Sequence, residues 1–350
     1  MLKRLKAPIS GYRNGLVPLD VDVFPQDNSN TKKEGVSRTY KNYDGYAPMA
    51  AYLGMEGWCL EVELRPGSQH SQKGFVDFIK RVIAGANDLS KQPLLVRADA
   101  GNDAIETLVA LENAEKTHYI VKWNPRKNDT VAWRDKVFAE GPVKTPRTGK
   151  RVGTIVVEEP RKIDEKTSIF KRVVRVTERT IDKKGQFLLA PDITLEGWWT
   201  DLEMAAEDVI ELYRQHATSE QFHSEFKTDL DLERLPSGKF ATNALVMALG
   251  AFAYNILRFI GQTQTAENRD PRVDVSGRTT DHHRPAIAFT LQPALPGFQR
   301  FQRRVLAAGS SQLRRKDEPM STTEDNCAFA SPNFGFFNEQ DAKVTVAYDL

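Results

Sequence analysis

An alternation of short apolar runs with amphipathic runs in the first third of the chain most constrains its fold. Short β-branched or apolar runs indicate buried strands, and apolar residues at helical spacing indicate helices packed on a sheet. The predicted strands are 16–24, 45–53, 57–64, 93–99 and 118–123, and the predicted helices are 74–86 and 104–111. This order is typical of an α/β fold, in which catalytic groups collect at the carboxyl ends of strands.

The pattern changes after residue 123. Residues 124–200 contain alternating or β-branched runs, so we expect a β-rich insertion there, and helices are predicted again at 205–213, from 219, and at 241–260. The predicted division is a first part of the core at 1–123, the insertion at 124–200, a helical second part of the core at 201–262, and a poorly ordered basic tail at 263–350.

Composition narrows the class of protein. With 40% hydrophobic and 27% charged residues the chain is globular, and a net charge of +2 neither requires nor excludes a nucleic-acid partner. Two cysteines, Cys59 and Cys327, give no disulfide or zinc pattern, which favours a reducing cytoplasm. The apolar run 241–260 is interrupted by Asn255 and Arg258, so a buried amphipathic helix is favoured over a membrane span.

Three acidic residues stand where a metal site could form. Asp22 lies on the first strand, with Asp20 on the same strand face as the alternative, Asp99 ends the fourth strand, and Glu220 begins a late helix. Magnesium prefers oxygen ligands, and two such ions about 3.5–4 Å apart can hold the attacking and leaving oxygens of a phosphoryl transfer. Each acid alone is weak evidence, but together they favour metal-dependent work on phosphodiesters.

The segment from Tyr213 to Lys227 places a tyrosine, a carboxylate and a lysine at intervals of seven residues. Residues seven apart return to nearly the same face of a helix. Thr218 with Gln221 predicts a capping box and a helix that restarts there, with Glu220 in its first turn. A carboxylate between two phosphate-binding groups fits the chemistry that the three acids suggest.

Segments 94–101, 198–202 and 213–227 together resemble the catalytic domain of bacterial insertion-sequence transposases of the DDE type. The branch that the chain most resembles is the thirteen-eighty insertion-sequence family, and the resemblance covers roughly residues 16–262. It implies a ribonuclease-H-like mixed sheet flanked by helices, with a β-rich insertion between the second and third catalytic acids.

The resemblance also implies roles for single residues. Asp22, Asp99 and Glu220 would form the catalytic triad that binds two Mg²⁺ ions, with Mn²⁺ as a substitute. Tyr213 and Lys227 would contact DNA phosphates near the cleavage point. The family motif is tyrosine, two residues, arginine, three residues, glutamate, six residues, lysine, and His216 stands at the position of the arginine.

The resemblance further implies double-stranded DNA as the partner, at transposon ends and at the target. A homodimer on DNA, no membrane contact, and a location at the nucleoid in the bacterial cytoplasm are implied as well. Histidine carries a charge only at lower pH or beside an acidic neighbour, so the departure at His216 bears on phosphate binding.

Three further residues are candidates for DNA contact. Arg97, two residues before Asp99, could bind DNA or pair with an acid, and the two alternatives are evenly balanced. Trp198 or Trp199 could stack on an unpaired base, a contact worth about 1–3 kcal/mol per base. The alternative for each tryptophan is packing of the insertion onto the core, which is slightly favoured.

The predicted function is therefore metal-dependent cleavage at transposon ends followed by strand transfer into target DNA, as in cut-and-paste transposition. The alternative is a truncated, catalytically incompetent remnant that acts as a DNA-binding or dimerising regulator, favoured by the short stretch before Asp22 and by the unfamiliar tail. A third hypothesis is a ribonuclease-H-like nuclease without strand transfer.

Overall fold

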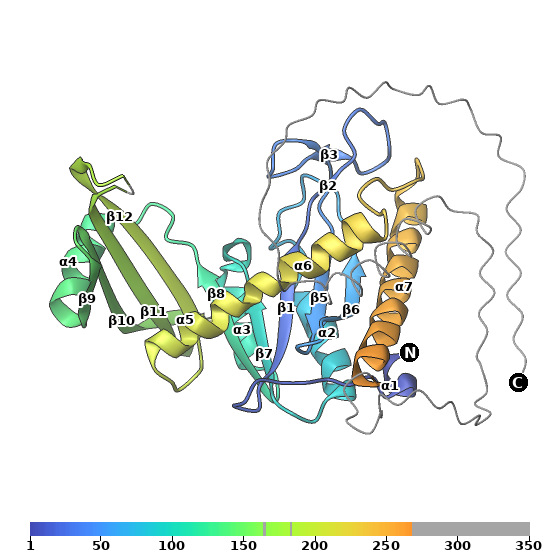
Figure 1. Ribbon diagram of the computed structural model, residues 1–350, viewed down its shortest axis with the longest axis horizontal. Helices are drawn as coiled ribbons and strands as arrows, with labels where there is room; N and C mark the ends of the chain where they lie inside the picture. The colour runs from blue at the N-terminus through green and yellow to red at the C-terminus, as the bar shows by residue number, and fades with distance from the viewer. Residues whose placement is uncertain (164–165, 183, 268–350) are drawn as a thin grey trace, which may run out of the picture. The chain divides into compact units, whose positions relative to one another are not determined.

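The computed structural model describes residues 1–163, 166–182 and 184–267. Its main sheet has nine strands in the order β6-β5-β1-β7-β8-β12-β11-β10-β9 (Figure 1). The strands are β1 (Val17–Val23), β5 (Met49–Leu53), β6 (Trp58–Glu63), β7 (Leu94–Ala98), β8 (Thr117–Trp123), β9 (Val143–Arg147), β10 (Lys150–Ile163), β11 (Lys166–Ile181) and β12 (Phe187–Thr200). β1, β7 and β8 run parallel, and their neighbours pair antiparallel.

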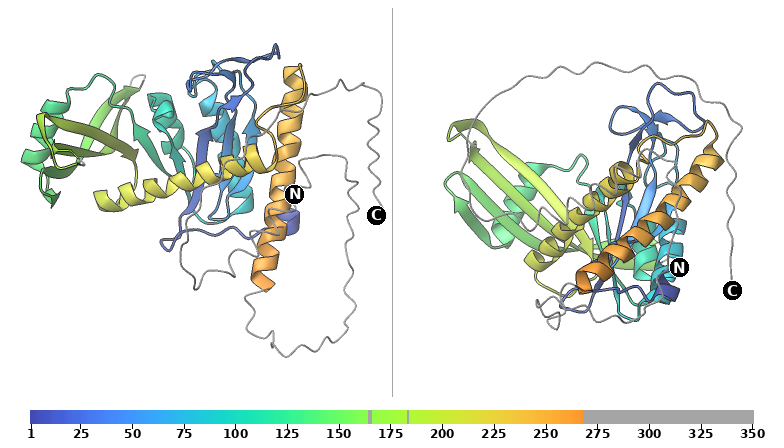
Figure 2. Two further views of the ribbon diagram at one scale, coloured as in Figure 1. Left: turned by 45° about the horizontal axis from the view of Figure 1, so that its top comes forward. Right: turned by 45° about the vertical axis from the view of Figure 1, so that its right-hand side comes forward.

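Helices flank this sheet. They are α1 (Leu2–Leu5), α2 (Phe75–Leu89), η1 (Ala100–Asn102), α3 (Ile105–Glu112), α4 (Thr130–Glu140), α5 (Ala206–Arg214), η2 (Gln215–Ala217), α6 (Thr218–Ser224), η3 (Glu225–Asp229) and α7 (Phe240–Glu267). Figure 2 shows α5 and α6 as one path across the sheet, with α7 beside it. The mixed α/β sheet confirms the predicted fold class in its coarse form and is consistent with a ribonuclease-H-like arrangement.

Alternation along β1 sorts its side chains onto the two faces of the sheet. Leu19 and Val21 pack in one hydrophobic cluster with residues of α2 and α3. Asp20 and Asp22 point to the opposite face, where their carboxylates meet histidines of η2 and α6. The period of two in the sequence thus places both acids beneath the α5–η2–α6–η3 run.

The predicted strand at 45–53 is divided in the structure. β4 (Asp44–Tyr46) pairs with β2 (Gln26–Asp27) and β3 (Ser37–Arg38) in a separate three-stranded sheet, whereas β5 pairs with β1 in the main sheet. Pro48 lies at the division and donates no backbone hydrogen bond. The small sheet positions the loop that carries Tyr40 and Lys41.

The residues between β8 and α5 form α4 and four strands. β12 pairs with β8, from Gly197 opposite Trp123 to Thr200 opposite Ile120, so these strands continue the main sheet. Helix α4 was not predicted, because Val137 is its one buried residue and the segment lacks an apolar stripe. Asp129 caps it by accepting from the N–H groups of Val131 and Ala132. The division into domains stays a prediction.

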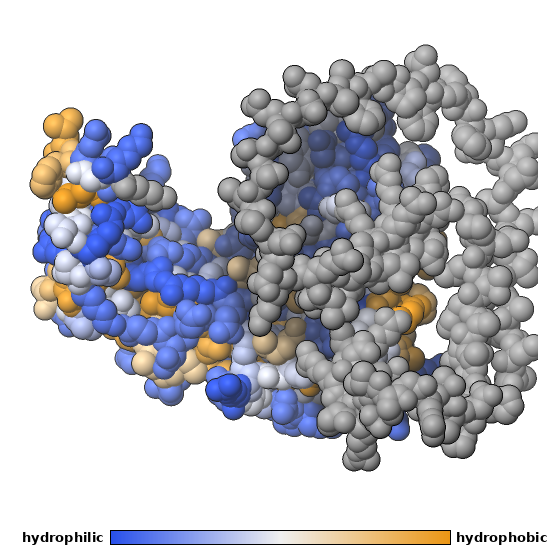
Figure 3. All heavy atoms as spheres, viewed as in Figure 1, coloured by the Kyte–Doolittle hydropathy of each residue, from blue (hydrophilic) through white to orange (hydrophobic). Residues whose placement is uncertain are grey.

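Helix α7 extends beyond its predicted end, and the rest of the predicted tail lies outside the described residues. One face contacts β6, where Asn255 hydrogen-bonds the backbone of Cys59. The other face exposes Leu245, Leu249 and Phe252, and Figure 3 shows an apolar patch over this helix. By length and composition alone Phe240–Thr263 could span a membrane. Of the residues in its most apolar stretch, 17% are buried. The predicted burial therefore applies to one face.

Candidate active site

One cavity of about 580 Å³ gathers the three predicted catalytic acids. Asp22 reaches it from β1, Asp99 from the end of β7, and Glu220 from the first turn of α6. Lys227 of η3 lines the same cavity. Residues from distant parts of the chain thus meet at the carboxyl ends of β1 and β7, as expected for an α/β sheet.

The three carboxylates differ in their surroundings. Asp22 is 26% exposed and its Oδ1 accepts a hydrogen bond of 2.7 Å from the N–H of Val23. Asp99 and Glu220 are exposed, and neither carboxylate makes a hydrogen bond or ion pair with any residue that the structure describes. All three therefore retain oxygen atoms with which to bind a ligand.

Asp20, the alternative first acid, is engaged inside the protein. It is 4% exposed, and Arg97 donates to its two oxygens over 2.6 and 2.7 Å. His216 Nδ1 lies 2.9 Å from Oδ1 of the same carboxylate. Burial opposes ionisation, but Arg97 and His216 outweigh it and hold the pKa of Asp20 below its usual value. Because Asp20 does not line the cavity, the geometry favours Asp22 as the first acid.

Arg97 and His216 form a buried cluster with Asp20. Arg97 is 1% exposed and also donates to the carbonyl of Leu212 over 2.6 Å, so its guanidinium has no surface to offer DNA. Of the two alternatives for Arg97, DNA binding and pairing with an acid, the structure shows the pairing, with Asp20. Burial lowers the pKa of His216, but Asp20 outweighs burial and raises it overall. His216 lines the cavity while its ring is committed to Asp20.

The Tyr213–Lys227 segment is not one regular helix. Between α5 and α6 the 3-10 turn η2 intervenes, and η3 after α6 is π-helical, so the even seven-residue face is interrupted. The predicted capping box is absent, because Thr218 instead donates its hydroxyl to the carbonyl of Gln215 over 2.9 Å. Glu220 and Lys227 still share the cavity, and Tyr213 does not line it.

Tyr213 nevertheless lies within electrostatic range of the site. Burial, and then the charges of Asp99 and Asp22, raise its pKa. Its hydroxyl therefore stays protonated and can donate a hydrogen bond. Lys227 is already engaged: its Nζ donates to the carbonyl of Pro25 over 3.0 Å and lies 3.0 Å from Oε2 of Glu233. A phosphate bound by Lys227 would have to compete with these two contacts.

Trp198 and Trp199 are packing residues in this structure, since each is 2% exposed. Lys122 Nζ lies 4.1 Å from the ring centroid of Trp198, and Trp199 donates through Nε1 to Asp103 over 2.9 Å. Neither indole face is open to an unpaired base. The packing alternative therefore describes both tryptophans as they stand here.

Several cavity residues were missed by sequence reasoning. His223 follows Glu220 by three positions on α6, a spacing that shares one helical face and that could have revealed it. Its Nδ1 lies 3.2 Å from the hydroxyl of Tyr52, and its Nε2 lies 3.5 Å from Asp22 Oδ2, which is too long for a well-formed hydrogen bond. Tyr40 and Lys41 lie in a loop whose sequence has no periodicity, so no pattern predicted that they line the cavity.

The donor set can be compared with the needs of a divalent cation. Mg²⁺ binds oxygen and is usually held by one or two protein carboxylates plus phosphate and water. Partial burial is the largest cause of the raised pKa of Tyr40, and the negative charges of Asp22 and Asp99 raise it further. These two carboxylates therefore act on the same part of the cavity. Within the described residues, no group of three His, Cys, Asp or Glu side chains is close enough to hold an ion. The donor chemistry fits a cation that substrate oxygens help to bind.

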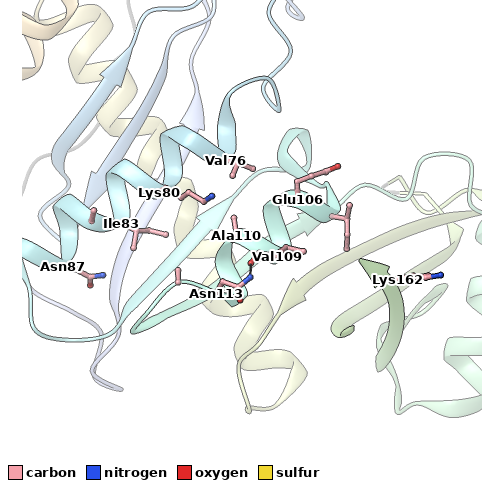
Figure 4. A pocket seen from close by; sticks show the side chains of 12 residues that line it. Val76, Lys80, Ile83, Asn87, Glu106, Val109, Ala110, Asn113 and Lys162 are labelled. Carbon is pink, nitrogen blue, oxygen red and sulfur yellow. Dashed lines mark hydrogen bonds between the residues drawn. The ribbon is translucent and has the colours of Figure 1, made fainter. Parts of the chain in front are cut away.

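A larger cavity, of about 710 Å³, lies between α2 and α3 (Figure 4), and none of the three acids lines it. Ile83 and Val109 contribute apolar walls, and Lys80 and Glu106 stand among the polar residues. Glu106 is its one acidic lining residue, so this cavity lacks the cluster of carboxylates that phosphoryl transfer would need.

Comparison with known proteins gives one family match. The family described as transposase DDE domain group 1 matches residues 12–275, which is more than half of the chain. No curated protein matches the chain at a significant level.

Two solved structures show distant likeness. A piggyBac transposase synaptic complex with hairpin DNA has a TM-score of 0.42 and 9% identity, covering 72% of this chain and 48% of that one. The NurA nuclease from Sulfolobus solfataricus has a TM-score of 0.23 and 9% identity, covering 78% of this chain and 91% of that one. This chain thus spans about half the length of the first structure. Both TM-scores are too low to establish a common fold.

Proposed function

Because this chain belongs to the family described as transposase DDE domain group 1, we propose that it cleaves DNA phosphodiesters at transposon ends and joins those ends to target DNA by a cut-and-paste reaction. The observation that carries the proposal is the shared cavity of Asp22, Asp99 and Glu220, in which the last two carboxylates have no partner among the described residues. Unpaired acids gathered around one cavity repel one another and favour a cation and its phosphate ligand.

Each protein group has a definable task. Asp22, Asp99 and Glu220, which as they stand are not grouped closely enough to hold one ion by themselves, would supply oxygen ligands to divalent cations that substrate phosphate helps to bind. A bound cation supplies positive charge to the reacting phosphate. Lys41 and Lys227 bring ammonium groups to the cavity and would bind the DNA backbone. Beneath these groups, the Asp20–Arg97–His216 cluster ties β1, β7 and η2 together. The cluster thereby positions two of the acids. Asp22 follows Asp20 by two residues on β1, and Glu220 follows His216 by one helical turn.

The proposal extends to finer features that the sequence resemblance implies. They are membership of the thirteen-eighty insertion-sequence family, a bacterial cytoplasmic location at the nucleoid, two Mg²⁺ ions with Mn²⁺ as a substitute, double-stranded DNA as the partner, and a homodimer on DNA without membrane contact. They also include a β-rich insertion between Asp99 and Glu220. The four strands between β8 and α5 support that last point.

A second candidate function is a catalytically incompetent regulator that binds DNA or dimerises with an active copy. It is favoured by one observation: within the described residues, no three potential metal ligands are grouped closely enough to hold an ion. In this alternative the cavity would bind DNA phosphate through Lys41 and Lys227 without cutting it.

A cleavage assay separates these functions. Plasmid DNA carrying the sequences that flank the gene would be incubated with the full chain and Mg²⁺, alongside plasmid without them. We expect cuts at the flanking ends that Glu220→Gln abolishes. Glu211→Gln makes the same chemical change on the exposed face of α5 and should leave cleavage intact.

Binding of flanking DNA without cleavage would overturn the enzymatic proposal and support the regulator. Cleavage of both plasmids at scattered positions would instead identify a nuclease without end specificity. Cleavage that survives Glu220→Gln would show that the reaction does not use the cavity described above.

A further inference from the structure

His223 of α6 is a buried histidine whose ring is held by two aromatic neighbours. Phe24 stacks on it, with the ring centroids 4.7 Å apart and an interplanar angle of 19°. Tyr52 meets it closer to edge-on, with the centroids 5.3 Å apart and an angle of 63°. A phenylalanine would suit such surroundings without burying polar nitrogen atoms, whose burial is costly unless they are hydrogen-bonded. A role specific to histidine must therefore come from its two ring nitrogens.

The first nitrogen, Nδ1, lies 3.2 Å from the hydroxyl of Tyr52 on β5. Burial raises the pKa of Tyr52 well above its usual value, so this hydroxyl keeps its proton. A neutral imidazole has one N–H and one acceptor nitrogen. When the hydroxyl donates to Nδ1, the proton of the neutral ring is therefore on Nε2. Tyr52 thus favours the tautomer of His223 that has its N–H at Nε2.

The second nitrogen, Nε2, faces Asp22. It is buried, lies 3.5 Å from Oδ2 of that carboxylate, and has no hydrogen-bond partner among the described residues. A lone pair at this place would be repelled by the carboxylate, whereas an N–H is attracted, so Asp22 favours the same tautomer as Tyr52 does. A shortening of about 0.3–0.8 Å would bring the two atoms into the ordinary hydrogen-bond range. His223 therefore presents an unpaired donor to the first acid of the site.

The carboxylate of Asp22 already has one restraint, from its own strand. Its Oδ1 accepts a hydrogen bond of 2.7 Å from the N–H of Val23 on β1. A bond from His223 to Oδ2 would add a restraint from α6, and donors on both oxygens would fix the rotation of the carboxylate about its Cβ–Cγ bond. Each carboxylate oxygen has two lone pairs, so one on each oxygen remains for the cavity. Carboxylates that bind metal ions are commonly held by such outer hydrogen bonds.

We propose that His223 is a positioning residue, which donates from Nε2 to Oδ2 of Asp22 and, with Tyr52 bound to its other nitrogen, sets the orientation of that carboxylate in the cavity. This inference rests on the proposed function. His223 also follows Glu220 by three residues on α6, so the same bond fixes the first acid relative to the third. In this role His223 binds neither DNA nor a cation, and it acts through Asp22.

Nuclear magnetic resonance tests the direction of this hydrogen bond without metal or DNA. The full chain would carry nitrogen-15 in its six histidines, and His223→Gln would identify the signals of His223. At about pH 8.5, well above the ordinary histidine pKa of about 6.5, we expect the proton of this ring on Nε2. Asp22→Ala should shift the Nε2 signal. Asp192→Ala, which breaks an exposed pair with Arg179, should not.

The Mg²⁺ dependence of cleavage tests whether this bond matters to the site. His223→Leu should raise the Mg²⁺ concentration for half-maximal cutting of the flanking DNA by about 10–100-fold, with unchanged binding of that DNA in EDTA. Tyr52→Phe should act in the same direction. His223→Gln keeps a side-chain N–H and should recover much of the loss. His118→Leu is the matched control and should change nothing, because His118 pairs with Asp201 at 2.7 Å and does not line the cavity.

A ring proton on Nδ1 alone would overturn the proposal, since Nε2 would then face Asp22 with a lone pair. An unchanged Mg²⁺ requirement in His223→Leu and Tyr52→Phe would overturn it as well. Tyr52→Phe removes a single oxygen atom, so it keeps this assay decisive if His223→Leu fails to fold. A wild-type chain that cuts no DNA would count against the proposed function, and the resonance experiment would still decide whether His223 donates to Asp22.

Discussion

Replacing Asp20 with asparagine should destabilise the protein strongly, although Asp20 does not line the candidate active site. The change keeps the shape of the side chain and removes its charge. Arg97, which is 1% exposed, and the buried His216 would then face each other without their shared counter-ion. Removing one partner of a buried ion pair costs about 3–5 kcal/mol, because the remaining charge is left uncompensated.

The structure indicates the lower end of that range. Arg97 would keep its hydrogen bond to the carbonyl of Leu212, and the amide oxygen of an asparagine could still accept one bond from the guanidinium. We therefore expect a loss of about 3 kcal/mol. With a urea m-value of about 3 kcal/mol/M, the unfolding midpoint would fall by about 1 M.

Urea unfolding in EDTA, followed by circular dichroism, measures this loss without any contribution from bound cations. Asp192→Asn is the matched control, because Asp192 forms an exposed pair with Arg179 at 3.2 Å. Exposed pairs contribute about 0–1 kcal/mol, so the control should barely move the midpoint. If Asp20→Asn shifted the midpoint no more than Asp192→Asn, the buried cluster would not stabilise the fold as argued.

Three further predictions follow from the same structure. The pKa of His216 is raised because Asp20 outweighs burial. The contribution of His216 to stability is therefore complete below about pH 6.5 and is lost as pH rises through its folded-state pKa. In urea unfolding across that pH range, His216→Gln should flatten the pH dependence of stability. Lys227→Ala should weaken duplex DNA binding and lower the slope of log affinity against log salt by about 1, and an unchanged slope would exclude a phosphate contact. Met247→Ala should lower the free energy of unfolding by about 2–5 kcal/mol, because Met247 is buried. Leu249→Ala, on the exposed face of α7, should change it by about 0.5 kcal/mol or less. Similar losses for the two variants would contradict the assignment of the faces.

The sequence predicted the sheet largely because periodicity is a local property. Alternation in β1 put Asp20 and Asp22 on one face, and the structure has both there. Which acid is buried depends on pairing across the sheet. Asp20 stands opposite Arg97 in the parallel register of β1 with β7. That register depends on how the two strands pair, so the sequence of either strand alone does not predict it.

The candidate site was predictable where its residues lie on regular elements. Glu220 and Lys227 were found through helical spacing, and both line the cavity. Tyr40 and Lys41 were not found, because the small sheet of β2, β3 and β4 brings their loop to the site and such loops carry no periodic signal. The burial of Trp198 and Trp199 follows from the pairing of β12 with β8. This pairing could not be predicted from the two tryptophans considered singly.

The hydrogen bond between Asp20 and His216 joins residues 196 positions apart in the chain. Contacts of such sequence separation form late, because closing a long loop costs entropy before the contact rewards it. Synthesis proceeds from the N-terminus, so Asp22 and Asp99 leave the ribosome well before Glu220. A nascent chain therefore holds two of the three acids without the third and without the histidine that fixes the first strand. The proposed cleavage site, assembled in this way, would remain inert until translation had passed the α6 helix.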